Sequence, residues 1–507
     1  MLMVAYALLL GAWFIATPAS NAPDEPFHYI KTVAMGRGDF FGQPTSVVAL
    51  NATDPLAIAT TKKLTRSFYM PAGLEVPASW FCMIQQRRAA AACVYETPVG
   101  PSRGGRQPSY VARYQPYPYL LAALGTTFAT DRLTALMLAR LGIALASVPF
   151  LIAAIWLVWD GTALSELGLV VAATPMVLFT SVILSPSGPE ICAGLCVLAA
   201  IIRISQDRDL GRGFWAALTL SAMMLATARA LGLLWILLDT GILIWLAGMP
   251  RLRQVTAKHR RAAVLSVTGL ALASAASIAW QLAVPAVGFT VPRISSRAVI
   301  DAVAYLPETF AESIGLFGWQ NTEMPRYGYV LWGLLSIGII TVALLRGKNR
   351  ERRLVDVLLV GSAVVVIGLS VVVFAPLGYQ VQGRYTLPFG ISIPLVAGEV
   401  VRRRRWTFRP GRLRSAVALA FVIAGAVQML GWYTNAHRGA VGADGSWWFV
   451  YTSQWAPYGG WLPSFCAAAA GAVALAAFGY FGGDPSVGVQ AVPALEKPSG
   501  RGLRSAE

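Results

Sequence analysis

Two carboxylates and a histidine stand close together near the start of the chain, within Pro23-Asp24-Glu25-Pro26-Phe27-His28-Tyr29. Proline suits the first turn of a helix and aspartate before it can cap free N–H groups, so the stretch predicts a helix start. Residues three or four apart share a helix face, which would place Glu25 and Asp24 near His28. We expect Asp24 to accept the proton of an attacking hydroxyl group, with Glu25 and His28 as its catalytic partners. The alternative is a capped helix that carries a surface histidine.

The same carboxylates could hold a divalent metal ion. Asp24 and Glu25 would then be the ligands, and oxygen donors of this kind suit Mg²⁺ or Mn²⁺. The sequence carries no zinc-type spacing of cysteine or histidine. Asp24 and Glu25 are therefore the candidate ligands for a divalent metal cofactor, and no other cofactor is expected.

Aromatic residues surround a glutamine in Tyr114-Gln115-Pro116-Tyr117-Pro118-Tyr119. Gln115 could donate and accept hydrogen bonds, and Tyr117 and Tyr119 could stack on a sugar ring. The alternative is an aromatic belt at a membrane interface, which explains the tyrosines without a ligand. We expect the three side chains to bind substrate.

An arginine follows a glycine in Gln380-Val381-Gln382-Gly383-Arg384-Tyr385. A guanidinium group can bind two phosphate oxygens at once, so Arg384, with Tyr385 beside it, predicts a lipid phosphate site. The alternative is an arginine that reaches toward lipid headgroups.

Two further charged residues are weaker candidates for the same site. Glu190 ends a tight turn and either contacts the site or simply begins a helix. Arg229 interrupts an apolar region, where a charge is costly and usually functional. We expect it to bind phosphate or to pair with Asp239.

The composition indicates a protein whose solvent is lipid. Of 507 residues, 56% are hydrophobic and 13% are charged, and the mean hydropathy is +0.58. A soluble domain cannot bury that much apolar surface. The formal net charge of +17 comes largely from short basic loops between apolar runs, so it reports membrane topology and not nucleic-acid binding.

Apolar runs predict an all-α polytopic membrane protein with about 12 spans. We expect one membrane domain over residues 1–482, with outer loops at 18–117, 284–328 and 435–462, and a disordered cytoplasmic tail over 483–507. The expected spans are Leu2–Thr17, Leu133–Trp159, Leu167–Leu184, Ile191–Ile204, Phe214–Ala228, Leu231–Ala247, Ala262–Ala283, Tyr329–Leu345, Leu354–Ala375, Leu387–Val401, Ala416–Tyr433 and Pro463–Phe481.

Basic residues set the orientation of these spans. The loops Arg203–Arg212, Arg251–Arg261, Arg346–Arg353 and Arg402–Arg414 contain 3, 5, 5 and 7 Lys or Arg and fall on one side in this count. That side is predicted to be cytoplasmic, with both termini. The long loops then lie outside, where Cys82 and Cys93 could form a disulfide; the alternative is two free thiols.

Three stretches together resemble a known family. They are Asn21-Ala22-Pro23-Asp24-Glu25-Pro26-Phe27-His28, Tyr114-Gln115-Pro116-Tyr117-Pro118-Tyr119 and Val381-Gln382-Gly383-Arg384-Tyr385. In order and in membrane side they resemble the bacterial polytopic membrane proteins called domain of unknown function 2142, over roughly Met1 to Tyr433. The chain departs from that pattern in having Ser187-Gly188-Pro189-Glu190 where Asn-Pro-Asp is expected.

The resemblance implies a function, because this family is similar to GT-C glycosyltransferases. Those enzymes use polyprenyl-phosphate sugars and keep an essential acid in the first outer loop, a role that would fall to Asp24. We therefore expect transfer of a sugar from a polyprenyl-phosphate donor to a glycan or lipid acceptor, outside the bacterial plasma membrane. A transporter or flippase of lipid-linked glycans and a non-enzymatic envelope assembly factor are the alternatives. A transporter would show two similar halves, and no such repeat is visible.

Overall fold

The computed structural model describes residues 1–47, 61–95, 103–206, 208–284, 295–378 and 380–483. Of the described residues, 74% are in helices and 4% in strands, and the predicted all-α polytopic class is confirmed. The described helices of eight or more residues follow in chain order: α1 (Leu2–Ala16), α2 (Glu25–Met35), α7 (Arg132–Val158), α8 (Ala163–Ala172), α9 (Pro175–Val182), α10 (Ser187–Ser205), α11 (Arg212–Ala228), α12 (Gly232–Lys258), α13 (Arg260–Ala283), α14 (Ser296–Ala304), α15 (Leu306–Gly315), α16 (Arg326–Arg346), α17 (Asn349–Leu369), α18 (Gly383–Gly390), α19 (Ser392–Arg403), α20 (Pro410–Val441) and α21 (Trp461–Phe481).

The expected number of spans is not confirmed. Within the described residues, eight helices are long and apolar enough to cross a membrane, or nine if the bent pair α8 and α9, which meet at 70°, form one span. Three expected spans fall short: α1 has 15 residues, α11 has 17, and 387–401 is divided between α18 and α19. A helix of 15 residues is about 22 Å long, less than the hydrocarbon core of about 30 Å.

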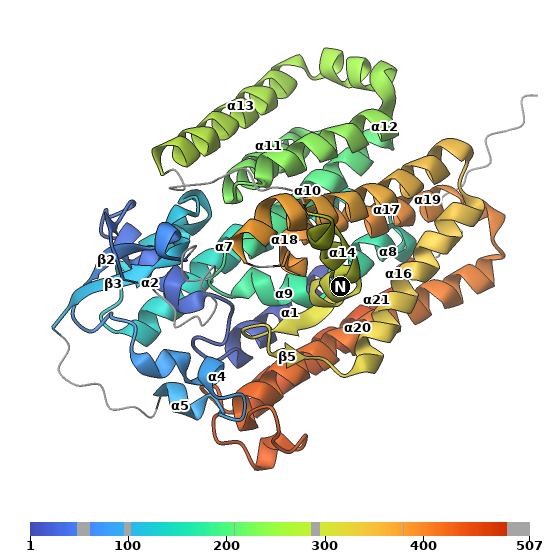
Figure 1. The fold of residues 1–507 in the computed structure, drawn as a ribbon. Coiled ribbons are helices and arrows are strands. Elements are labelled where there is room, and N and C mark those ends of the chain that lie inside the picture. The colour runs from blue at the N-terminus through green and yellow to red at the C-terminus, as the bar shows by residue number, and fades with distance from the viewer. Residues whose placement is uncertain (48–60, 96–102, 207, 285–294, 379, 484–507) are drawn as a thin grey trace, which may run out of the picture.

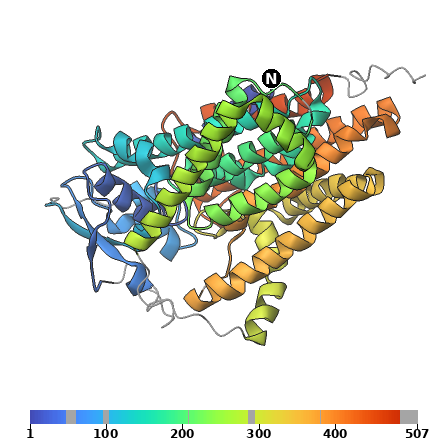
Figure 2. The ribbon, with the colours of Figure 1, turned by 90° about the horizontal axis from the view of Figure 1, so that it is seen from above.

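The first long loop builds a small lobe at one end of the bundle (Figure 1, blue to cyan; Figure 2). It contains α2 and an antiparallel sheet in the order β1-β2-β3. A disulfide joins Cys82 and Cys93, whose Cα atoms are 6.2 Å apart. The other elements of the lobe are β1 (Gln43–Pro44), β2 (Arg66–Met70), α4 (Cys82–Gln85), α5 (Ala92–Tyr95), β3 (Gly105–Ser109) and α6 (Leu120–Thr126).

Helix α10 forms the centre of the bundle, and 94% of its apolar stretch is buried inside the protein. It packs against α7, α9, α11 and α12. Gly188 permits the close contact between α10 and α9. Any larger residue would clash there, because its Cβ would lie 2.3 Å from the carbonyl oxygen of Thr180. This packing fixes the start of α10, where Glu190 lies.

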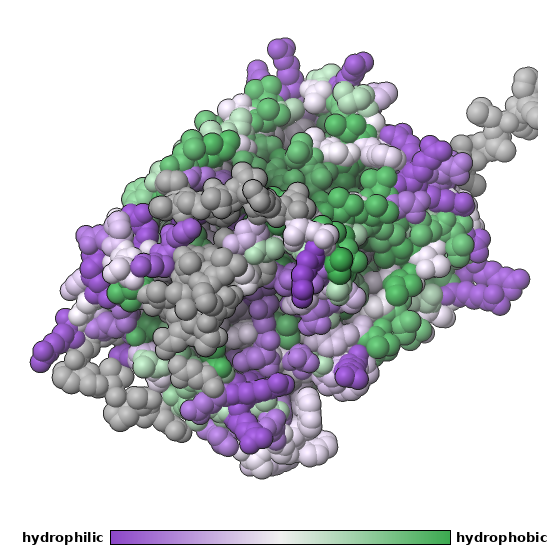
Figure 3. Space-filling model, viewed as in Figure 1, coloured by the Kyte–Doolittle hydropathy of each residue, from purple (hydrophilic) through white to green (hydrophobic). Residues whose placement is uncertain are grey.

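The outer helices expose apolar side chains. Leu265, Leu272 and Leu282 of α13 are 70%, 66% and 74% exposed. Figure 3 shows green apolar residues across the helical part of one face, with purple hydrophilic residues at its right-hand end and lower left. An apolar surface of this kind suits contact with lipid. Of the expected tail 483–507, residues 484–507 lie outside the described part.

Candidate functional site

Asp24 lies immediately before α2, and its backbone has φ of 61°, in the left-handed region. Such a conformation costs a non-glycine residue of the order of 1–3 kcal/mol and is frequent at functional sites. The expectation that its carboxylate caps the helix is wrong, because the side chain makes no cap hydrogen bond. Instead Tyr110 donates its hydroxyl proton to Oδ1, and Nη2 of Arg384 lies 3.1 Å from Oδ2. The carboxylate is therefore held toward Arg384.

Glu25 has a different environment from Asp24. Its side chain is buried, and Arg140 of α7 contacts both carboxylate oxygens, at 2.7 and 2.6 Å. The backbone N–H groups of Ser20 and Leu184 also donate to it, at 3.0 and 3.2 Å. With both oxygens bound in this way, Glu25 fixes the start of α2 against α7, and we place it outside the reaction centre.

His28 is buried one helical turn after Asp24. Its Nδ1 lies 2.7 Å from the hydroxyl oxygen of Tyr119, and its ring packs against Tyr114. Burial lowers the pKa of His28 well below 6.5, and the nearby cations Arg229 and Arg384 lower it further. The imidazole is therefore neutral around pH 7.

Two arginines from distant parts of the chain meet at Tyr385: Arg384 is in α18, and Arg229 directly follows the end of α11. Arg384 and Arg229 lie over its ring, with guanidinium carbons 5.1 and 4.5 Å from the ring centre. Arg384 is buried and its Nε has no hydrogen-bond partner among the described residues. The pair concentrates positive charge beside Asp24.

Glu190 and Ser187, at the start of α10, hold Arg229 in place. Arg229 Nε lies 3.3 Å from a carboxylate oxygen of Glu190, and Nη2 donates to Ser187 Oγ at 2.8 Å. Trp235 donates to the other oxygen of Glu190 at 3.1 Å. The expected alternative partner, Asp239, is wrong: the structure pairs Arg229 with Glu190 instead.

The tyrosine-rich stretch divides between two neighbours. Gln115 donates to Ser277 Oγ at 2.7 Å, and Tyr117 donates to the carbonyl oxygen of Ala276 at 3.0 Å, both on α13. Tyr119 instead contacts His28. The structure therefore joins Tyr119 to the cluster that contains Asp24, His28 and Arg384, whereas Gln115 and Tyr117 attach the lobe to α13.

The family model described as "Predicted membrane protein (DUF2142)" matches residues 7–393. The chain belongs to this family. No curated protein matches it. Two solved structures of ArnT from Cupriavidus metallidurans are similar in fold at 14% sequence identity. The match to the apo state has a TM-score of 0.42 and covers 94% of this chain and 76% of that chain. The match to the undecaprenyl phosphate-bound state has a TM-score of 0.43 and covers 94% of this chain and 77% of that chain.

Sequence reasoning missed three residues of this DUF2142 site. Tyr110 reaches Asp24 across 86 positions, a separation that no spacing rule detects. Glu312 of α15 accepts the N–H of Gly383 at 2.6 Å and so positions the start of α18. Lys31, one turn beyond His28, is buried and donates to the carbonyl oxygens of Ala112 and Tyr114. The one sequence feature that could have indicated Lys31 is its position three residues after His28, on the same face of α2.

The donor set does not fit the expected divalent metal. The described residues of the DUF2142 chain contain no group of three or more His, Cys, Asp or Glu that could hold an ion. Both oxygens of Glu25 are occupied by Arg140, and both oxygens of Asp24 have partners, one of them cationic. A metal ion would have to displace a guanidinium group, so these residues do not suit one.

Proposed function

We propose that the chain is a GT-C type membrane glycosyltransferase that moves a sugar from a polyprenyl-phosphate donor to a glycan or lipid acceptor. The observation that carries the proposal is the Asp24–Arg384 pair. In this pair the carboxylate of Asp24, whose backbone is in the left-handed region, lies beside the buried guanidinium group of Arg384. The transfer reaction requires both groups in one site, the carboxylate to accept a proton and the guanidinium to bind phosphate.

The reaction needs a base and a group that stabilises the departing phosphate. Asp24 accepts the proton of the acceptor hydroxyl, whose oxygen attacks the anomeric carbon of the sugar. The bond from that carbon to the phosphate oxygen breaks, and its electron pair leaves with the polyprenyl phosphate. Arg384 binds the phosphate and balances its growing charge. Direct displacement inverts the anomeric centre.

Arg229 supplies a second cation to the same phosphate. It lies over the ring of Tyr385, as Arg384 does, and Glu190 holds it in place. When the donor binds, its phosphate competes with Asp24 for Arg384, which frees an oxygen of Asp24 to act as the base. Tyr110 keeps its proton, because burial and Asp24 raise its pKa, and it continues to orient the carboxylate.

An apolar cavity beside Arg384 suits the lipid tail of the donor. Its volume is about 270 Å³, and it is lined by residues of α8, α15, α16, α17, α18 and α19. Thr386 and Leu387, on the same short helix as Arg384, are part of its wall. If the donor phosphate binds Arg384, its apolar lipid tail would thus lie in this cavity between the helices.

We place the reaction on the outer face of a bacterial plasma membrane, with both termini in the cytoplasm. The support is the excess of Lys and Arg in the four short loops at the other end of the spans. A lipid-linked donor fits that side, where nucleotide-activated sugars are absent.

The test is complementation in a host from which the gene is deleted. Wild type, Asp24→Asn and Asp301→Asn are expressed at matched membrane levels, and envelope glycans and lipid-linked sugars are profiled. Asp301 is an exposed carboxylate on α14 and serves as the control. We expect Asp24→Asn to leave the glycan missing and its lipid-linked donor accumulated, while Asp301→Asn restores both. Full restoration by Asp24→Asn would reject the transferase and favour a transporter or an assembly factor.

A further inference from the structure

A basic cavity lies at the end of the bundle away from Asp24, where α12, α17 and the end of α19 meet. Its volume is about 460 Å³. Six of its lining residues are Lys or Arg, and Glu351 is the acidic one. The proposed transfer reaction does not use it.

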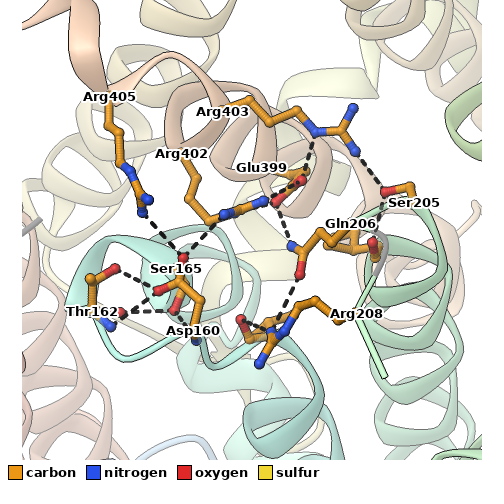
Figure 4. Close-up of polar contacts among 12 residues, drawn as sticks. Asp160, Thr162, Ser165, Ser205, Gln206, Arg208, Glu399, Arg402, Arg403 and Arg405 are labelled. Atoms are coloured by element: carbon orange, nitrogen blue, oxygen red, sulfur yellow. Dashed lines mark hydrogen bonds and ion pairs between the residues drawn. The ribbon is translucent and has the colours of Figure 1, made fainter. Parts of the chain in front are cut away.

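Carboxylates neutralise part of this charge, and Figure 4 shows two of them, Glu399 and Asp160. Glu399 contacts Arg402 and Arg403, both at 2.7 Å, and Asp160 contacts Arg402 and Arg405 at 3.1 and 3.4 Å. The contacts of Asp160 tie the end of α19 to the α7–α8 turn, whereas those of Glu399 lie within α19.

Positive charge remains after these pairs are counted. Glu351 contacts Arg404 at 2.6 Å, so Glu351, Glu399 and Asp160 stand against the six lining cations, which leaves a net charge of +3. Arg405 Nε is buried and has no hydrogen-bond partner among the described residues. The cavity therefore favours an anion that can accept hydrogen bonds.

The cavity opens at the boundary of the apolar surface. Trp245 of α12 donates to the carbonyl oxygen of Arg350 at 3.1 Å, and Arg350 donates back to the carbonyl oxygen of Trp245 at 2.6 Å. About two turns further along α17, the exposed side chains become apolar, with Val357, Val360 and Val364. Tryptophan beside a basic loop is typical of the headgroup level of a membrane.

We propose that this cavity binds the phosphate headgroup of an anionic phospholipid. Lys348 and Arg350, at the start of α17, contact the phosphate oxygens, and the arginines at and just after the end of α19 supply the guanidinium groups opposite. The acyl chains lie along the exposed apolar residues of α12 and α17. Basic pockets between spanning helices recognise anionic headgroups through the same combination of charge and adjoining apolar surface.

The test uses the full chain, purified and delipidated in a neutral detergent. The melting temperature is titrated with phosphatidylglycerol, phosphatidylcholine or inorganic phosphate, for wild type and for Lys348→Gln/Arg350→Gln. Arg261→Gln/Arg353→Gln is the control, because it removes the same charge from exposed positions that do not line the cavity. Lys348→Gln alone is a second variant, since its side chain is exposed at a helix start and its loss is compatible with folding.

We expect phosphatidylglycerol to raise the melting temperature of wild type and control, with apparent affinity about tenfold weaker in the double variant and intermediate in Lys348→Gln. Equal stabilisation by phosphatidylcholine would overturn the proposal, as would equal affinity in wild type and both cavity variants. An equal effect of inorganic phosphate would assign the cavity to a free anion and reject the lipid. No shift with any of the three would also reject it.

Discussion

Asp24 and Arg384 lie 360 positions apart in the sequence, yet Arg384 Nη2 lies 3.1 Å from Asp24 Oδ2. The contact joins the loop after α1 to the first turn of α18. The adjacent residue, Glu25, pairs with Arg140 on α7 instead. The two neighbouring carboxylates thus have different roles. Glu25 holds the start of α2 against the bundle, whereas Asp24 is available to act when a ligand competes for Arg384.

Asp24→Asn should abolish the proposed transfer with a smaller loss of stability than Glu25→Gln, because the Asp24 side chain is 19% exposed whereas that of Glu25 is fully buried. Asparagine tolerates left-handed backbone, so the conformation at φ 61° is kept while the base is lost. Loss of a general base costs about 10²–10⁴-fold in rate. The measurement is sugar release from the lipid donor by purified protein, together with the melting temperature. Asp24→Ala should lose the same activity but melt lower, because alanine disfavours that backbone.

The long helices could be predicted from the sequence because apolar runs of sufficient length have few other structures available. Leu133–Trp159 and Tyr329–Leu345, for example, correspond to α7 and α16 within a few residues. The expected span 387–401 did not form one long helix, since α18 ends at Gly390 and α19 begins at Ser392. Local composition does not determine such breaks when neighbouring helices pack on both sides.

The site was predictable only in part. Asp24, His28 and Arg384 were expected from residue type and position, and the structure brings them into one cluster. Which of the two adjacent acids would contact which arginine could not be predicted, because the partners Arg140 and Arg384 come from helices placed by tertiary packing. The same reason explains why Gln115 was expected in the cluster but lies against α13.

Arg384→Lys should weaken donor binding more than it lowers the maximal rate. Lysine keeps the positive charge but cannot contact two phosphate oxygens in a fixed plane. A lost hydrogen bond between charged groups costs about 1.5–3 kcal/mol, so KM for the lipid donor should rise about tenfold to a hundredfold. Steady-state kinetics with graded donor concentrations measure this. Arg326→Lys, at an exposed position on α16, should leave KM unchanged; a similar rise in both variants would contradict the assignment.

Glu25→Gln should destabilise the protein more strongly than a surface change does. It leaves Arg140 charged and buried without its partner, which typically costs about 3–5 kcal/mol. Glu25→Met/Arg140→Met should melt above the single variant, because neither charge remains buried. Recovery should be incomplete, since Arg140 also donates to the carbonyl oxygens of Thr17 and Pro18. Glu323→Gln, on an exposed strand residue, is the matched control. Melting temperatures equal to wild type for Glu25→Gln would show that the pair does not hold α2.

His28 should make stability fall in mildly acidic solution. Its pKa is lowered in the folded protein by burial and by Arg229 and Arg384, from an ordinary value of 6.5 that the unfolded chain retains. Between the folded and unfolded pKa values the unfolded chain binds more protons, so the stability contributed by neutral His28 is complete above pH 6.5 and is lost as pH falls below it. Melting temperatures measured from pH 8 to pH 5 should therefore decline less steeply in His28→Gln than in wild type. Identical slopes in the two proteins would mean that another group governs the acid transition.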